Sequence, residues 1–176
     1  MARPTWAGAA NSSMGAMDQK NSELFRHVMS RFPTGVTVVA TLLPDGTPRG
    51  LTVNAFTSVS LDPPLVLVCI DKSAVSHGQL REVGRFAVTV LSVDQAAIAR
   101  QFASRPHDGR FDSVTWRTSE GGSPILDEGA AWVDCVLDRV IEAGDHSIFL
   151  ARVIGAESSG QEPLLFHAGA FGGTGA

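Results

Sequence analysis

Residues 50–61, GLTVNAFTSVSL, alternate between two kinds of side chain in steps of two. One set is mostly apolar and comprises Leu51, Val53, Ala55, Thr57, Val59 and Leu61. The other set is small, polar and uncharged apart from one phenylalanine, and comprises Thr52, Asn54, Phe56, Ser58 and Ser60. A period of two predicts a strand with one core face. Because a face turned to water more often carries Lys, Glu or Arg, the polar face indicates either a ligand, a subunit contact or an unusual outer surface.

The region before this stretch predicts a helix and then a hairpin. Ser22 is placed to cap the helix, which ends before Pro33. Its apolar residues share one face: Leu24, Phe25, Val28, Met29 and Phe32. Residues 34–42, TGVTVVATL, are rich in β-branched side chains, and the turn PDGTPR joins them to residues 50–61. We therefore expect these two segments to form an antiparallel hairpin.

The rest of the chain continues as strands with two further helices. Residues 65–71, LVLVCID, are apolar on both faces, which predicts a central buried strand. Helices are expected at 73–83 and 94–104, the second capped by Asp94, and strands at 86–92, 130–142 and 147–155. Five or six strands joined mostly by turns favour an antiparallel barrel with helices at its rim. A dinucleotide fold is not expected, because no G-x-G-x-x-G turn is present.

Composition narrows the class of protein. The chain has 176 residues, 44% of them hydrophobic and 18% charged, which fits one globular domain. A net charge of -4 argues against nucleic acid as a partner, and no apolar run approaches the roughly 20 residues that cross a bilayer. Residues 1–20 are expected to be a flexible extension without the apolar segment of a secretory signal, and residues 172–176 a flexible tail. Cys69 and Cys135 are expected to be buried thiols in a reducing cytoplasm.

Candidate chemistry lies in four segments, none of which is a standard catalytic motif. The five histidines are not at metal-ligand spacing, so no metal is expected and a cofactor would have to supply the chemistry. Small polar side chains at 52–58 could hold a planar heterocycle. The segment CIDKSAVS, 69–76, could hold a phosphate; the alternative is that Ser73 only caps a helix and Lys72 is solvated. The turn at His146 and the loop at Phe102 to Phe111 are each compatible with a plain structural role.

Taken in order, these motifs resemble the short-chain flavin reductase family, the reductase components of two-component flavin monooxygenases. The resemblance covers about residues 21–171, which is the expected domain, and T-x-N-A-F-x-S-x-S-x-D-P-P with GDH are its most specific parts. It implies a six-stranded antiparallel Greek-key split barrel that is mainly β with peripheral helices. It also implies a cytoplasmic homodimer that reduces FMN or FAD with NADH or NADPH and passes the reduced flavin to a monooxygenase.

The resemblance also implies roles for individual residues. The isoalloxazine and ribityl chain would lie against Thr52, Val53, Asn54, Ala55 and Ser58. The ribityl end and phosphate would be held by Cys69, Lys72, Ser73 and Ser76, and covered by Phe102, Ala103 and Arg110. His146 would lie beside the nicotinamide and flavin as the catalytic residue, and Phe171 near the mouth of the site. Two alternatives are a flavin or haem carrier on the same barrel, and an oxidase of a phosphorylated pyridoxal-type compound.

Overall fold

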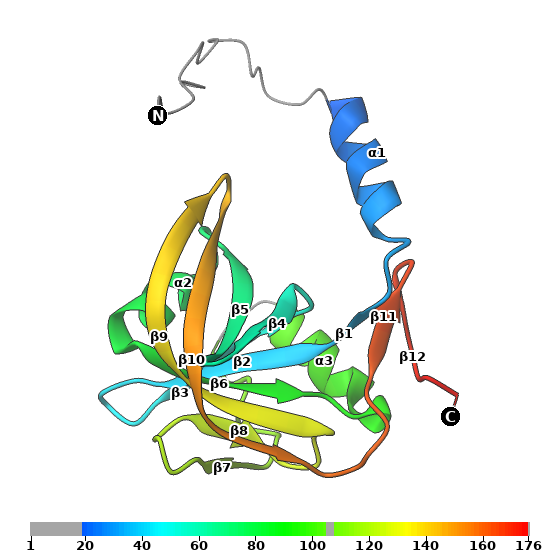
Figure 1. The fold of residues 1–176 in the computed structure, drawn as a ribbon. Helices are drawn as coiled ribbons and strands as arrows, with labels where there is room; N and C mark the ends of the chain where they lie inside the picture. Colours follow the sequence, from blue (N-terminus) through cyan, green and yellow to red (C-terminus); the bar gives the residue numbers. More distant parts are fainter. Residues whose placement is uncertain (1–18, 105–107, 176) are drawn as a thin grey trace, which may run out of the picture.

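A computed structural model describes residues 19–104 and 108–175 and shows a mainly β protein with a few helices (Figure 1). The helices of this part of the chain are α1 Gln19–Met29, α2 Val75–Val83 and α3 Ala96–Ala103, with a 3-10 turn at Val93–Gln95. The longer strands are β2 Thr37–Leu42, β3 Pro48–Val53, β4 Phe56–Leu61, β5 Pro64–Asp71, β6 Arg85–Val90, β9 Ala131–Ala143 and β10 His146–Ser158. The shorter strands are β1 Thr34–Gly35, β7 Trp116–Thr118, β8 Pro124–Leu126, β11 Leu165–His167 and β12 Ala170–Gly172.

The main sheet has seven strands in the order β3-β2-β6-β9-β10-β5-β4, and every neighbouring pair is antiparallel. Its two edge strands, β3 and β4, are separated by only two residues of chain, Asn54 and Ala55. The sheet must therefore curl until its edges meet at one end. No ladder joins β3 to β4, so the curled sheet stays open along that line.

The prediction of an antiparallel, mainly β fold is confirmed, but a closed barrel of six strands is not what the structure shows. The difference arises within residues 50–61, which form two strands instead of one. Phe56 turns inward against the core, whereas Val59 and Leu61 are exposed, Leu61 to 95%. The alternation is inverted after the break at Asn54–Ala55, so the predicted core face was wrong beyond Val53. Phe56, the one large apolar residue of the polar set, is thus partly buried against the core cluster.

The curled sheet encloses one apolar cluster, and α3 covers a second. The first cluster is built from inward side chains of β2, β5, β6 and β10, including Val39, Val68, Phe86 and Phe149, all essentially without exposed surface. The expected hairpin of β2 with β3 is present, with Ala40 opposite Gly50. Only one face of β5 is fully buried, because Leu67 and Cys69 on the other face remain partly open. The expectation of a strand buried on both faces is therefore only half fulfilled.

The first helix and the helix after β6 do not begin at the residues that the sequence predicted. Ser22 lies inside α1, which begins at Gln19, so it is not the N-cap. Before α3, Ser92 rather than Asp94 opens the turn, because the Ser92 backbone N–H donates to Oε1 of Gln95, 3.1 Å away. The apolar spacing of the first helix is seen in α1, except that Phe32 follows the helix end, and α3 buries Ala99 and Phe102. None of the described helices is both long and apolar enough to span a bilayer.

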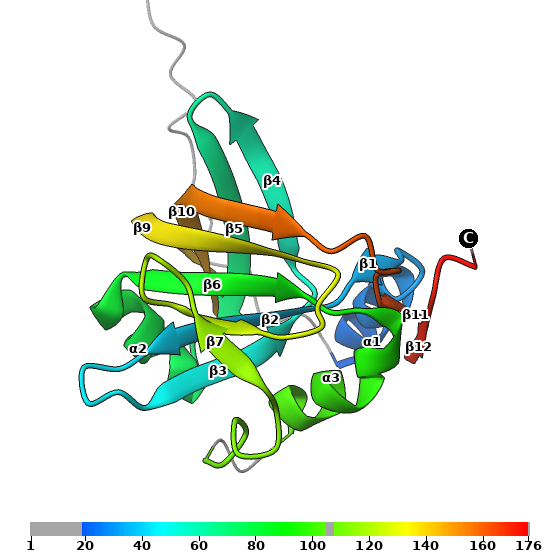
Figure 2. The same cartoon turned by 90° about the horizontal axis from the view of Figure 1, so that it is seen from below.

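Two hairpins project from the sheet, and α1 extends away from it. Figure 1 shows the β9–β10 hairpin and α1 pointing away from the sheet body, and Figure 2 shows the β4–β5 hairpin doing the same. The end of the chain forms β11 and β12, which join β1 in a three-stranded sheet. Thr174 Oγ1 and the Gly175 N–H both donate to Glu162, at 2.8 and 2.9 Å. Residues 174 and 175 are thus tied to the body of the protein.

Candidate flavin site

The pairing of β5 with β10 brings two of the candidate segments together. His146 lies opposite Asp71 at the ends of these strands. The Lys72 N–H donates to the Asp145 carbonyl oxygen at 3.0 Å, which ties the turn after β5 to the tip of the β9–β10 hairpin. Gly144, with φ of +63°, takes the left-handed conformation in that tip, which favours glycine. Residues 72 and 146 are therefore neighbours although 74 positions separate them.

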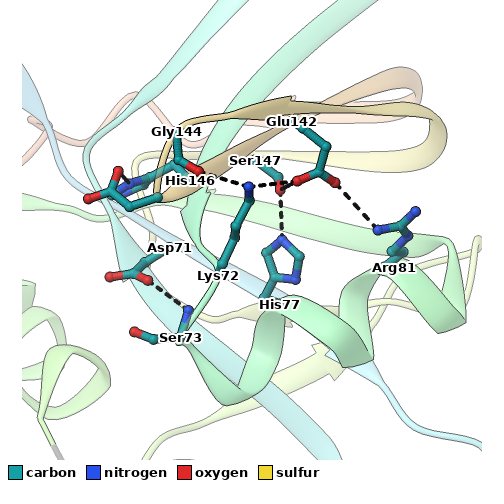
Figure 3. Close-up of polar contacts among 10 residues, drawn as sticks. Asp71, Lys72, Ser73, His77, Arg81, Glu142, Gly144, His146 and Ser147 are labelled. Atoms are coloured by element: carbon teal, nitrogen blue, oxygen red, sulfur yellow. Dashed lines mark hydrogen bonds and ion pairs between the residues drawn. The ribbon is translucent and has the colours of Figure 1, made fainter. Parts of the chain in front are cut away.

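The Lys72 ammonium group is held by the hairpin (Figure 3). It donates to the Gly144 carbonyl oxygen at 2.8 Å and forms an ion pair with Glu142 at 2.8 Å. Arg81, from α2, approaches the same carboxylate at 3.6 Å. All three side chains are at least partly exposed, 39% for Lys72 and 58% for Glu142. The Glu142 carboxylate thus contacts two cationic side chains, Lys72 and Arg81.

A second chain of polar contacts runs beneath this ion pair. The buried hydroxyl of Ser147 lies 3.0 Å from Nε2 of His77 and 3.4 Å from Glu142. The His77 ring also meets Phe149 edge-on, with centroids 5.2 Å apart. His146 points elsewhere, with Nδ1 2.8 Å from the Asp145 carboxylate. The two histidines therefore occupy different environments, and only His146 lies at the strand end beside the turn.

Three carboxyl groups around this hairpin tip have pKa values below their usual range. The Glu142 pKa is lowered by its hydrogen bond to Lys72 and by the positive charges of Lys72 and Arg81. The Asp71 pKa is lowered by donation from Ser73, whose N–H lies 2.7 Å away. The Asp145 pKa is lowered by its hydrogen bond to His146. All three are therefore ionised at neutral pH, and the local positive charge is largely balanced.

The polar stretch 52–58 is only partly available to a ligand. Asn54, Ala55 and Ser58 are exposed around the break between β3 and β4. The Thr52 hydroxyl is already used, because it donates to the Ala99 carbonyl oxygen of α3 at 2.7 Å. Val53 is buried in the core, so only its backbone could contribute. The uncharged donor surface thus centres on Asn54 and Ser58 rather than on Thr52.

The second predicted segment adjoins this surface. The Cys69 N–H donates to the Ala55 carbonyl oxygen at 2.9 Å, so the two segments touch at the break. Cys69 is half-buried and, like Cys135, a free thiol; burial raises the pKa of both, that of Cys135 to about 12. Ser73 is exposed and does not cap α2, whose N-cap is Ala74. Ser76 is buried, so of the four predicted residues it is the least accessible.

The third predicted segment is mostly internal. Phe102 has no exposed surface and meets Phe111 edge-on at 4.9 Å, in the cluster under α3. Arg110 is 4% exposed; its guanidinium donates to the Gly50 carbonyl oxygen at 2.8 Å and to that of Ser104. Desolvation lowers the Arg110 pKa. Ala103 is exposed, and residues 105–107 lie outside the described part. In this arrangement Phe102 and Arg110 fasten α3 and its following loop to β3.

Phe171 lies in β12, beside a surface hollow of about 390 Å³ lined also by Pro33 and His167. The Arg100 guanidinium stacks over its ring at 5.1 Å. A second hollow, of about 500 Å³, lies by Trp132 and Arg117. Neither hollow is lined by residues 52–58 or by Lys72. The candidate site thus lies apart from these two hollows, at a surface where Asn54, Ser58 and Lys72 are exposed.

Sequence reasoning missed Glu142, His77 and Ser147 as parts of this region. Glu142 looks like an ordinary solvated charge near the end of an exposed strand, and nothing in its neighbours marks it. One signal was available: antiparallel strands joined by the two-residue turn at 144–145 place residues 142 and 147 opposite each other. The pairing of β10 with β5, which brings Lys72 to Glu142, could not be read from local pattern.

Comparison with known proteins identifies the family. Residues 29–175 match the model of the flavin reductase like domain, so the chain belongs to that family. It is 45% identical over 146 residues to a probable flavin reductase of Rhizobium meliloti, covering 83% of this chain and 47% of that protein. It is 40% identical over 159 residues to the reductase component of the flavin-dependent trigonelline monooxygenase of Acinetobacter baylyi, covering 90% and 51%. This chain thus spans about half the length of both relatives.

A solved structure agrees along the whole fold. The NADH:FAD oxidoreductase of Streptomyces globisporus is 44% identical, with a TM-score of 0.82, covering 90% of this chain and 96% of that one. The resemblance seen in the motifs at 52–64 and 144–146 is therefore confirmed at the level of the family.

Proposed function

We propose that this protein is an NAD(P)H:flavin oxidoreductase, built on a split barrel, that reduces FMN or FAD and supplies it to a monooxygenase. The observation that carries the proposal is the contact between Ala55 and Cys69. It joins the exposed, uncharged donor surface at the break in the sheet to β5, the strand that leads into the turn carrying Lys72. Such a surface next to a single cation suits a phosphorylated heterocycle. The families of the relatives above support the same reaction.

The residues present fit a flavin in chemical type. Asn54 and Ser58 would donate to and accept from the ring edges, while the backbone of Val53 and Ala55 would lie along the ring. Lys72 and Ser73 would hold the phosphate, with Cys69 against the ribityl chain. Thr52, Ser76, Phe102 and Arg110 would support this surface from behind, Ala103 would border it, and Phe171 would lie near its mouth.

The bound cofactors would supply the redox chemistry, in which a hydride, carrying two electrons, would be transferred from the nicotinamide to the flavin. The protein's task is then to bind and orient. His146, half-exposed at the strand end beside the Lys72 turn, would contact the nicotinamide, and its Nδ1 lies 2.8 Å from the Asp145 carboxylate, which would orient the ring. No acid or base from the chain is needed for the hydride step.

We also propose a homodimer, with a separate monooxygenase as the receiver of reduced flavin. The candidate surface of one chain is open, and exposed apolar side chains gather on α1, as at Leu24, Phe25 and Val28. A second copy covering these residues would both bury them and wall the site. The reductase role of the Acinetobacter relative supports the oxygenase partner.

The test is NADH and NADPH oxidation under anaerobic conditions, with FMN, FAD or no flavin. We expect slow oxidation without flavin and at least a tenfold faster rate with one of them. His146→Ala should lower kcat or raise the nicotinamide KM while leaving the urea midpoint unchanged. Flavin binding without turnover on either nicotinamide would instead favour a carrier. An oxidase of a phosphorylated pyridoxal-type compound would need a more cationic phosphate site than Lys72 with its carboxylate partner.

A further inference from the structure

Glu142 lies where it competes with a ligand for the cations of the proposed phosphate site. Its carboxylate is 2.8 Å from Lys72 Nζ and 3.6 Å from Arg81. Figure 3 shows both cations pointing toward it from different elements, Lys72 from the turn after β5 and Arg81 from α2. The carboxylate belongs to β9, which carries none of the predicted site residues.

The donors of Lys72 are largely used in this arrangement. An ammonium group has three N–H donors, and two of its acceptors are present, Glu142 and the Gly144 carbonyl oxygen. One donor is then left for a phosphate oxygen. The charge of Glu142 also stays close to any anion that Lys72 binds, because the Ser147 hydroxyl and Arg81 hold the carboxylate in place. Like charges this close repel at an exposed site, although water and salt reduce the effect.

On the basis of the proposed phosphate role of Lys72, we propose that Glu142 weakens the hold of this site on the flavin phosphate. It is thereby an affinity-determining residue that makes the flavin an exchanging substrate. A reductase that hands its product to another protein must release it, and release is governed mainly by the dissociation rate. Glu142 sets that rate without contacting the reacting ring.

The opposite role is also physically possible and gives the opposite result. If Glu142 served to position Lys72 for the phosphate, its removal would loosen the lysine and weaken phosphate binding. The sign of the change therefore separates the two roles. Riboflavin, which has the same ring and ribityl chain without the phosphate, serves as the internal reference.

The experiment compares FMN and riboflavin binding by the full chain, using flavin fluorescence. Glu142→Gln removes the charge and keeps the shape, and the matched control is Glu82→Gln, an exposed carboxylate on α2 with no ion pair among the described residues. We expect Glu142→Gln to bind FMN about two- to fivefold more tightly, the range for one nearby charge at an exposed site. Its FMN dissociation rate should fall by a similar factor. Riboflavin affinity should be unchanged, and Glu82→Gln should match the wild type for both ligands.

A double-mutant cycle tests whether Lys72 carries the effect. On a Lys72→Gln background, the gain from Glu142→Gln should fall to less than half. An unchanged ratio of FMN to riboflavin affinity in Glu142→Gln, weaker FMN binding, or a gain that persists in full without Lys72 would each overturn the proposal. A wild-type protein that binds none of FMN, FAD and riboflavin would overturn the proposed function itself. Failure of the proposed function can therefore be told apart from failure of the Glu142 proposal.

Discussion

Asn54 lies where the chain leaves one edge of the main sheet and joins the other. Its side chain is exposed, while its neighbours Val53 and Phe56 pack into the core. An exposed amide at a fixed break in a sheet presents donors and an acceptor without needing to support the fold. Its removal should therefore affect a ligand more than stability.

We expect Asn54→Leu to weaken flavin binding about tenfold, since one or two neutral hydrogen bonds are worth about 1 kcal/mol each. The free energy of unfolding should change by less than about 0.5 kcal/mol, as for other exposed substitutions. Fluorescence titration and urea unfolding measure the two quantities. Thr57→Val, an exposed change of similar kind on β4, is the control and should leave affinity unaltered. Equal affinities of Asn54→Leu and wild type would remove Asn54 from the site.

At the same scale, the sequence predicted which residues of 50–61 share a face but not which of their polar groups are free for a ligand. The alternation and the missing charge singled out Asn54 and Ser58, and both side chains are exposed. The sequence pattern could not show that the Thr52 hydroxyl donates to the Ala99 carbonyl oxygen, or that Phe102 is buried. Both features depend on how α3 packs against β3. A local period reports which residues share a face, but not what lies opposite that face.

Among the elements, the tip of the β9–β10 hairpin and the turn after β5 form one electrostatic unit. The hydrogen bond from the Lys72 N–H to the Asp145 carbonyl oxygen joins them, and Asp71, Glu142 and Asp145 surround it. Each of these carboxyl groups has a folded-state pKa lowered from its usual value of 3.8 or 4.5. Groups of this kind stabilise the fold above the unfolded pKa, and the contribution is lost as the pH falls through the folded pKa.

We therefore expect the unit to be intact from pH 7 down to about pH 4.5 and to open at lower pH as the three carboxyl groups take up protons. The measurement is hydrogen exchange of the Lys72 amide, corrected for its intrinsic rate. The Leu91 amide, bonded to the Val36 carbonyl oxygen at 2.9 Å and away from these carboxyl groups, is the control and should stay protected. Opening near pH 6.5 would point to a histidine instead of the carboxylates.

Elements with a strong period were predictable and short ones were not. The β2–β3 and β9–β10 hairpins follow from β-branched runs around a turn signal. Strands β7, β8, β11 and β12 have three residues each, too few to show a period of two. The break at Asn54–Ala55 was hidden because neither residue is Gly or Pro, so the alternation appeared continuous. The sequence pattern therefore could not predict that the sheet curls so that the chain passes from edge strand β3 to edge strand β4 at this break.

At the scale of the whole molecule, α1 is notable because its apolar side chains are not packed against the rest of the single chain. Its apolar face is exposed, from 50% at Met29 to 60% at Leu24, although it has the spacing of a packed helix. Helices of about 11 residues are marginal in water and usually need a packed face. The homodimer that we propose would provide that packing.

We expect the wild-type protein to be a dimer by size-exclusion chromatography with light scattering, and Phe25→Glu to shift it toward monomer. A buried charge in an apolar contact is unfavourable by several kcal/mol, enough to dissociate a dimer at micromolar concentration. Arg26→Glu, also exposed on α1 but outside the apolar face, is the control and should remain dimeric. If the candidate surface is walled by the second copy, Phe25→Glu should also weaken flavin binding at low protein concentration, and more protein should restore it. A monomeric wild type, or a Phe25→Glu variant that stays dimeric, would show that something other than a second copy covers this face.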